Sequence, residues 1–387
     1  MKAVISGIGI ISAAGFNLEQ NLKGLKNGKR NGGKVSAFST ILPYPVFEVK
    51  SLPEKCAEEG MRTRNLAFTA LKEALDNAGL QAPLSGFRTG VCIGTTVASQ
   101  LNDISFYTSF RKSGSADLKP VDLFLKGNLA ESVAGFLNAS GPSVTVVNAC
   151  SSGTDAIGIA LSWLKAGFCD VAIAGGADEI NRVPLCGFGS LGILSNSLCA
   201  PFDKNRSGLN LGEGAGILII EREDFYIKRC GKPSLYLSGY GSFADAYHLT
   251  APRPDGTGLE SAIRKALSDA GVLPADICFI NAHGTGTLDN DKVEGSVLSR
   301  VFGNKIKFLS TKGYTGHTLG GAGGIEAVYT AAALKEGWIP SNAGFECKDD
   351  DIPITPVTEN TDIKGSFALS TSLAFGGNNS AIVIERA

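Results

Sequence analysis

Residues 143–166 read SVTVVNACSSGTDAIGIALSWLKA, a short apolar strand that runs into a tight turn and then into a helix. The second half of the chain repeats this arrangement, with KIKFLSTKGYTG at residues 305–316 and the helical segment IEAVYTAAALKEG at residues 325–337. Both helices are apolar nearly all round, which is typical of helices packed between two layers. The repetition predicts two similar α/β units with these helices between them.

The rest of the chain extends this internal repeat. Each half begins with a strand-like run into Ser-Gly-x-Gly, continues with an amphipathic helix that a glycine ends, and closes with a hairpin-like pair of strands. The matched segments are residues 2–13 with 232–246, 65–78 with 259–270, 90–95 with 277–284, and the closing pairs 170–178 and 215–222 with 366–377 and 379–386. We expect a duplicated α/β fold of five layers (αβαβα) with mixed sheets, whose halves, residues 1–225 and 226–387, are fused into one body.

Two segments, residues 97–140 and 180–212, have no counterpart in the second half. Insertions on a repeated core commonly carry function. We expect these two to build the site or an interface.

Composition excludes several classes of function. The 387 residues carry 36 basic and 37 acidic side chains, a net charge of −1, which argues against nucleic-acid binding and against a polybasic membrane binder. The nine cysteines are scattered without any C-x-x-C pair, which argues against a disulfide scaffold or a zinc finger. No metalloprotease, Walker A or EF-hand pattern occurs. We expect a protein of the reducing cytoplasm that holds no metal.

The apolar run at residues 3–16 resembles a signal peptide at first sight. Interior glycines and the lack of a basic cluster before it favour a buried strand instead. No apolar run approaches the roughly 20 residues needed to cross a bilayer.

Four strand-to-turn segments carry the residue types of a reaction centre. Cys150 stands where a strand meets a helix, and a helix N-terminus lowers the pKa of a thiol there, an effect that Asp155 in the first turn partly offsets. The others are NAHGTGT at 281–287, STKGYTGH at 310–317 and LAFGGNN at 373–379, whose glycines could aim backbone N–H groups at an anion. Equivalent turns of a duplicated fold meet at one end, so we expect Cys150, His283, His317 and the turn around Phe375 to share one pocket.

With these segments in view, the chain resembles the β-ketoacyl-acyl-carrier-protein synthases, the elongating condensing enzymes of the thiolase superfamily. The resemblance covers essentially the whole chain and includes ACSSG, PFD-x-x-R-x-G…GEGAG, DAYH-x-T-x-P, NAHGTGT, STK-x-x-x-GH and FGG-N, in the family's order. It implies a thiolase-like fold and a triad of Cys150, His283 and His317. Cys150 would take an acyl chain from a carrier thioester, and the two neutral imidazoles would stabilise the enolate formed when malonyl thioester loses CO₂.

The resemblance also implies roles for neighbouring residues. Lys312 and Glu326 would pair behind the second histidine and orient it, although a purely structural ion pair is an equal alternative. The N–H groups of Cys150 and Phe375 would form an oxyanion site, and the side chain of Phe375 would act as a gate. Thr285 and Thr287 would contact the phosphopantetheine arm. Phe188 would line the acyl pocket, and Gly376 and Gly377 would contact substrate. For His248 we expect a structural role. No resident cofactor is implied, since the substrates are carried on the phosphopantetheine group of acyl carrier protein.

Some positions depart from the family pattern. Ser207 replaces the usual acidic residue, Leu288 and Asp289 follow Thr287 where proline is more usual, and residues 17–60 look shortened. These departures concern the acyl pocket and carrier docking, and they resemble ketosynthases of secondary pathways, including aryl-polyene synthesis.

The resemblance implies a dimer, either a homodimer or a heterodimer with a related ketosynthase or chain-length factor. Arg62, Arg64 and Lys119 are candidates for contacts with an acidic carrier protein. Two alternatives are a non-catalytic chain-length-factor subunit, which would lack the nucleophile, and a thiolase-like enzyme acting on coenzyme A, which would carry a second catalytic cysteine.

Overall fold

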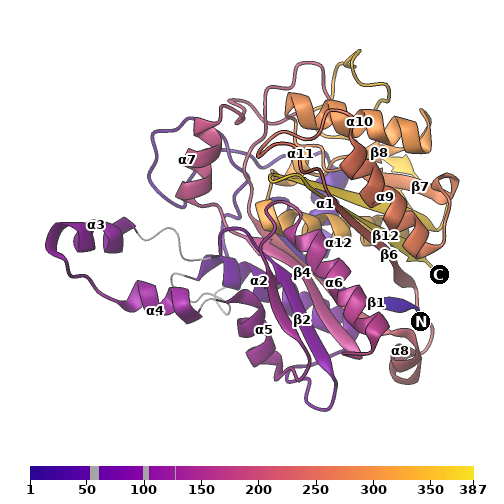
Figure 1. Cartoon of the computed structure of the whole chain (residues 1–387), viewed down its shortest axis with the longest axis horizontal. Coiled ribbons are helices and arrows are strands. Elements are labelled where there is room, and N and C mark those ends of the chain that lie inside the picture. The colour runs from indigo at the N-terminus through magenta and orange to yellow at the C-terminus, as the bar shows by residue number, and fades with distance from the viewer. Residues whose placement is uncertain (53–60, 99–103, 127) are drawn as a thin grey trace.

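The computed structural model describes residues 1–52, 61–98, 104–126 and 128–387 (Figure 1). Residues 53–60 of the shortened stretch, and residues 99–103 and 127 of the first insertion, lie outside the described part. Ten strands form one sheet in the order β3-β2-β4-β5-β1-β6-β12-β11-β7-β8. Their bounds are β1 Ala3–Ser12, β2 Thr89–Gly94, β3 Ser143–Val146, β4 Val171–Asp178, β5 Gly214–Arg222, β6 Leu235–Ala244, β7 Ile277–Asn281, β8 Phe308–Leu309, β11 Phe367–Ala374 and β12 Asn378–Arg386.

The strand order shows the duplication directly. The first half runs β3-β2-β4-β5-β1, and the second half runs β8-β7-β11-β12-β6, which is the same order of equivalent strands. In each half four strands run in one direction, and the fourth strand in this order, β5 or β12, is antiparallel to both of its neighbours, so each half of the sheet is mixed as predicted. Within the sheet, the described strands of the two halves join where β1 pairs with β6, at Ala3 with Leu237 and Val4 with Tyr236. The predicted closing hairpins are β4–β5 and β11–β12.

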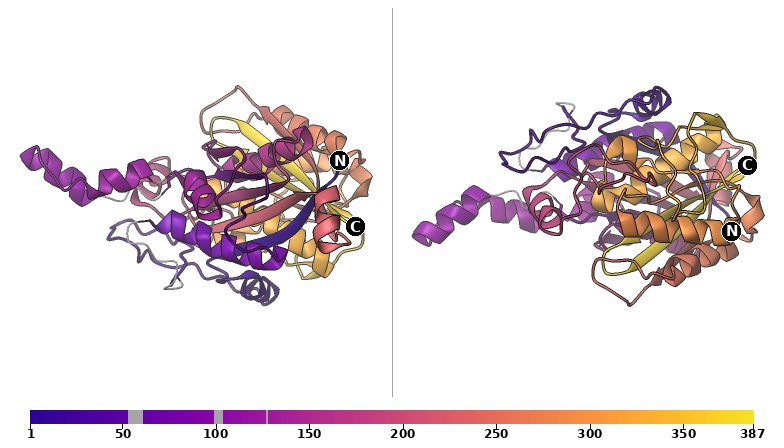
Figure 2. Two further views of the ribbon diagram at one scale, coloured as in Figure 1. Left: turned by 90° about the horizontal axis from the view of Figure 1, so that it is seen from below. Right: turned by 90° about the horizontal axis from the view of Figure 1, so that it is seen from above.

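The helices form the remaining three layers, which the views in Figures 1 and 2 show. α6 (Ser152–Ala166) and α12 (Ala322–Glu336) lie in the middle and contact strands of both halves. α2 (Arg62–Ala78) and α5 (Leu129–Leu137) cover the outer face of the first half, and α9 (Thr257–Ala270), with α10 (Leu288–Phe302) beside it, covers that of the second. The five-layered fold is confirmed. The shorter elements are α1 Leu18–Lys26, α8 Glu223–Cys230, η2 Pro274–Asp276, α11 Lys312–Thr315, η3 Leu319–Gly321, β9 Trp338–Ile339 and β10 Thr361–Asp362.

Glycines inside β1 and β6 explain how closely the outer helices approach. The two Ser-Gly-x-Gly segments lie within these strands, whereas the sequence had suggested a strand that ends there. A Cβ atom on Gly9 would come within 2.0 Å of the carbonyl oxygen of Ala70, and one on Gly241 within 2.1 Å of that of Ala262. α2 and α9 therefore pack against bare backbone at equivalent places.

The two insertions take different forms. Within the first, α3 (Ile104–Ser113) and α4 (Lys119–Lys126) project from the body as an arm (Figures 1 and 2). The second contains α7 (Arg182–Ser190), which lies above the first-half sheet in Figure 1. Residues 3–12 form β1 between β5 and β6, so the strand prediction for the N-terminal run is confirmed. Among the described residues, no helix is both long and apolar enough to span a membrane.

Candidate active site

Cys150 stands in the turn between β3 and α6, where the sequence predicts it. The preceding residue, Ala149, has a φ of +48°, so the turn is tight, and the thiol is buried. Its Sγ lies 3.0 Å from Nε2 of His317, and the backbone N–H of Phe375 points at the same sulfur. Strand ends from the two halves thus meet at one sulfur atom.

The environment of this thiol corrects one prediction. Burial raises the pKa of Cys150 to about 11, although the charge of Lys312 and the N–H of Phe375 act in the opposite direction. The expected lowering by the helix terminus is therefore wrong for the free enzyme. The carboxylate of Asp155 accepts hydrogen bonds from Asn148 and Ser151, on either side of Cys150 in the sequence, and from Tyr240 and Ser380.

His283 and His317 face each other across the site. Both are buried, and their ring centroids lie 5.1 Å apart at an interplanar angle of 87°. Burial, followed by the nearby charge of Lys312, holds the pKa of each imidazole well below its usual range. Both rings are therefore neutral at physiological pH, as the condensation chemistry requires.

Lys312 and Glu326 form the expected buried ion pair, but the pair lies behind His283 and not behind His317. Nζ of Lys312 lies 3.0 Å from Nδ1 of His283 and donates to the carbonyl oxygen of the same residue at 2.7 Å. A lysine ammonium has only protons to offer, so Nδ1 is an acceptor and the imidazole proton resides on Nε2. Lys312 thereby fixes the tautomer that makes His283 a donor.

His317 has no such partner. Among the described residues, its Nδ1 and the Oε2 atom of Glu326 make no hydrogen bond although both atoms are buried. No described protein group therefore fixes the tautomer of His317, and Nε2 is the ring nitrogen that faces Cys150.

Two acidic residues that sequence reasoning missed hold the loop of His283. The carboxylate of Glu294 accepts hydrogen bonds from the backbone N–H groups of His283 and Gly284, each at 2.8 Å, and Asp291 accepts from Gly286. Both acids are buried. The signal was present in NAHGTGTLDNDKVEG, where acids in the first turns of the following helix lie on one face.

The turn after β11 contributes one amide to the site. Phe375 directs its N–H at Cys150, but the N–H groups of Gly376 and Gly377 bond to the carbonyl oxygens of Leu249 and Ala374. These two N–H groups are therefore not directed at an anion in the cavity, and the substrate contacts of the glycines stay a prediction. Their φ angles of +87° and +80° show that both glycines shape the turn.

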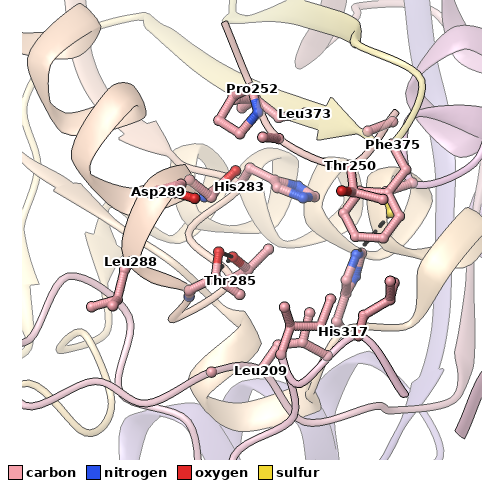
Figure 3. A pocket seen from close by; sticks show the side chains of 18 of the residues that line it. Leu209, Thr250, Pro252, His283, Thr285, Leu288, Asp289, His317, Leu373 and Phe375 are labelled. Atoms are coloured by element: carbon pink, nitrogen blue, oxygen red, sulfur yellow. Dashed lines mark hydrogen bonds between the residues drawn. The ribbon is translucent and has the colours of Figure 1, made fainter. Parts of the chain in front are cut away.

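A cavity of about 330 Å³ opens onto these groups, and Figure 3 shows how His283, His317 and Phe375 converge on it. Phe188 lines it as predicted, and its ring stacks on that of Phe375 with centroids 5.4 Å apart. The remaining lining includes Thr285 and Thr287, whose hydroxyls lie 2.9 Å apart, together with Ser207, Leu288 and Asp289, the positions that depart from the family pattern.

Other expected positions lie elsewhere. Arg62, Arg64 and Lys119 are not among the residues that line the cavity, and Arg62 instead forms an ion pair with the buried Glu213. His248 is exposed, and its Nδ1 accepts from two backbone N–H groups at 3.1 Å, so the structural interpretation is confirmed. No cluster of potential metal ligands occurs in the described ranges.

Comparison with known proteins gives matches along the whole chain. Residues 47–225 match the family "Beta-ketoacyl synthase, N-terminal domain" and residues 236–346 match "Beta-ketoacyl synthase, C-terminal domain". The 3-oxoacyl-[acyl-carrier-protein] synthase 2 of Staphylococcus aureus (strain MRSA252) is 32% identical over 100% of this chain and 98% of that protein. The enzyme of the same name from Synechocystis is 34% identical with the same coverage.

Comparison with solved structures also gives matches along the whole chain. The ishigamide ketosynthase/chain length factor superposes with a TM-score of 0.93 at 29% identity, covering 100% of this chain and 99% of that chain. A type II polyketide ketosynthase in complex with its acyl-carrier protein superposes with a TM-score of 0.90 at 26% identity and the same coverage.

Proposed function

The chain belongs to the β-ketoacyl synthase family, and from that premise we propose which of its residues perform each step. The enzyme is a condensing acyltransferase of fatty-acid or polyketide chain elongation. The observation that carries the assignment of residues is the meeting of the Cys150 thiol, two neutral imidazoles and the N–H of Phe375 in one cavity.

In the first step, the sulfur of Cys150 attacks the thioester carbonyl of an acyl carrier protein. The carbon–sulfur bond to the carrier breaks, and the acyl group becomes a thioester of Cys150. Nε2 of His317, at 3.0 Å, takes the thiol proton and returns it to the departing carrier thiolate. This relay removes the need for a free thiolate, which the buried site disfavours.

In the second step, a malonyl thioester loses CO₂. We assign the donation of a hydrogen bond to its thioester carbonyl to Nε2–H of His283, whose tautomer Lys312 holds, and to His317 in its Nε2–H form. The resulting enolate forms a carbon–carbon bond to the acyl carbonyl, and the carbon–sulfur bond to Cys150 breaks. The Cys150 thiolate that leaves takes up a proton from water, which restores the thiol for the next turnover. The N–H groups of Cys150 and Phe375 would stabilise the intervening oxyanion, each donor contributing about 3 kcal/mol.

Acyl carrier protein is the proposed partner, and its phosphopantetheine arm enters along Thr285 and Thr287. Both threonines line the cavity, and their hydroxyls lie 2.9 Å apart, which suits an arm with two amide groups. The substrates bring their own prosthetic group, so the proposal includes no resident cofactor. Phe375, stacked on Phe188, is the proposed gate between the acyl and malonyl substrates.

A dimer formed along β3 is the proposed assembly. β3 is an edge strand of the sheet, and Val144 and Val147 expose 42% and 67% of their surface. The arm adds Tyr107, Phe110 and Leu118, which are also exposed. The second subunit would be another copy or a chain-length factor, and Cys150 makes this chain the catalytic member. We place the enzyme in the cytoplasm and in a secondary pathway of the polyketide or aryl-polyene type.

Turnover of defined substrates tests the assignment. The enzyme is mixed with acyl-carrier and malonyl-carrier protein, and 3-ketoacyl-carrier product is measured for saturated and conjugated acyl chains. We expect product from the wild type, none from the Cys150→Ala variant, and normal product from Cys186→Ala, which removes an exposed thiol. Product from Cys150→Ala would refute the assignment. Preference for saturated chains would refute the aryl-polyene pathway, and a monomer by sedimentation would refute the dimer.

A further inference from the structure

Asp155 is a buried carboxylate that none of these steps uses. It lies in the first turn of α6, five residues after Cys150, and only 4% of its surface is exposed. Its Oδ2 atom accepts hydrogen bonds from Nδ2 of Asn148 at 2.6 Å and from the hydroxyl of Ser151 at 2.8 Å. This oxygen therefore binds the residues on both sides of the nucleophile turn.

The other carboxylate oxygen faces the second half of the molecule. It accepts hydrogen bonds from the hydroxyl of Tyr240 in β6, at 2.8 Å, and from the hydroxyl of Ser380 in β12. The preceding residue, Thr154, makes a parallel contact, because its hydroxyl lies 2.8 Å from that of Ser372 in β11. Thr154 and Asp155 of α6 therefore form hydrogen bonds to both strands of the β11–β12 hairpin, whose turn contains Phe375.

Ser372 and Ser380 are directly paired across this hairpin, and Phe375 follows three residues after Ser372. The two N–H groups assigned to the oxyanion site belong to separate halves of the chain, and the Asp155 network bridges those halves close to both groups. No cationic side chain pairs with Asp155 in the described ranges; its donors are an amide and three hydroxyls. A carboxylate with four such donors is held more firmly than a neutral group would be.

We propose that Asp155 is a positioning residue that sets the spacing between the N–H groups of Cys150 and Phe375. The inference rests on the function proposed above and adds how the oxyanion site is assembled. Displacing one donor by a fraction of an ångström weakens its bond to the developing oxyanion, whereas the imidazole of His283, held by Lys312 and by the Glu294 contact to its backbone, is unaffected.

The two half-reactions separate this role from a general structural one. Acyl transfer to Cys150 passes through an oxyanion and needs both N–H groups, whereas malonyl-carrier decarboxylation depends on the imidazoles. For Tyr240→Phe and for Ser380→Ala, we expect acyl loading to slow about ten-fold while CO₂ release changes less than about two-fold. Asp155→Asn places an amide N–H against donor hydroxyls, and we expect a loss of loading of about a hundred-fold or more. The two milder variants decide the question if that protein fails to fold.

The matched control is Tyr329→Phe, which removes another buried tyrosine hydroxyl, one that donates to Asn21 at 2.7 Å. We expect this variant to behave as wild type in both half-reactions. Wild-type loading by Tyr240→Phe and Ser380→Ala, or an equal fall of both half-reactions, would overturn the positioning role. Failure of the wild type itself to load Cys150 would refute the proposed function, and the inference would fall with it.

Discussion

Removing the charge of Lys312 is the perturbation whose consequences the structure defines most fully. Lys312 is 1% exposed, and its Nζ contacts Glu326 and His283. Lys312→Met keeps most of the volume of the side chain but leaves the carboxyl group of Glu326 buried without its partner. The resulting loss of stability follows from the cost of keeping that carboxyl group neutral.

The magnitude depends on pH. With Lys312 present, burial already raises the pKa of Glu326 from its ordinary value of 4.5 to about 7. Without the lysine the carboxyl group stays protonated in the folded variant, and it ionises only on unfolding. At about pH 8.5, four units above the ordinary value, this costs the variant about 5.4 kcal/mol at about 1.36 kcal/mol per unit. In the wild type the carboxyl group ionises near pH 7, so its cost stops at about 3.4 kcal/mol, and the loss caused by the substitution is about 2 kcal/mol. At about pH 5.5 the carboxyl group is protonated in both folded proteins, and the loss falls to near zero.

Urea unfolding of the wild type, of Lys312→Met and of Lys312→Met/Glu326→Gln across this pH range provides the assay. The double variant carries no buried charge at this place, so we expect it to recover most of the lost stability and to lose the pH dependence. A loss below about 1 kcal/mol at about pH 8.5, or a loss that does not change with pH, would refute this account of the pair.

Three further predictions follow from the packing and the site. Gly9→Ala should lower the free energy of unfolding in urea by about 2 kcal/mol or more, because the new Cβ atom would clash with the carbonyl oxygen of Ala70. Gly135→Ala is the control, and it should stabilise the protein slightly because the space around this position in α5 is open. Alkylation of Cys150 by iodoacetamide should accelerate about ten-fold per pH unit from neutral pH upward, since the raised pKa keeps the thiol protonated; a flat profile would contradict this. Thr285→Val should raise KM for the carrier substrate about ten-fold with kcat less affected, and an unchanged KM would remove the threonine from the arm's path.

Local sequence patterns were enough to predict the duplicated fold and the meeting of Cys150, His283 and His317. Each lies at a strand end followed by a turn, and equivalent strands of a duplicated sheet place their ends together. The place of Lys312 was not predictable in this way. It stands five residues before His317 in the sequence, but its side chain reaches His283, 29 residues away, through a contact between β7 and the turn after β8.

Two other errors share a physical cause, which is that short segments do not reveal their tertiary surroundings. A helix terminus contributes about 1 kcal/mol to a thiolate, whereas full burial shifts a pKa by up to about 3–5 units, so burial dominates at Cys150. The glycines after Phe375 looked available as donors, but the turn itself uses their N–H groups.

The most direct test of the central claim is the intact mass of the protein after incubation with acyl-carrier protein, followed by peptide mapping and then by addition of malonyl-carrier protein. We predict one acyl adduct, located on Cys150, that disappears as 3-ketoacyl product forms, and no adduct on Cys150→Ala. An adduct at another residue, or the same adduct on the Cys150→Ala variant, would contradict the account.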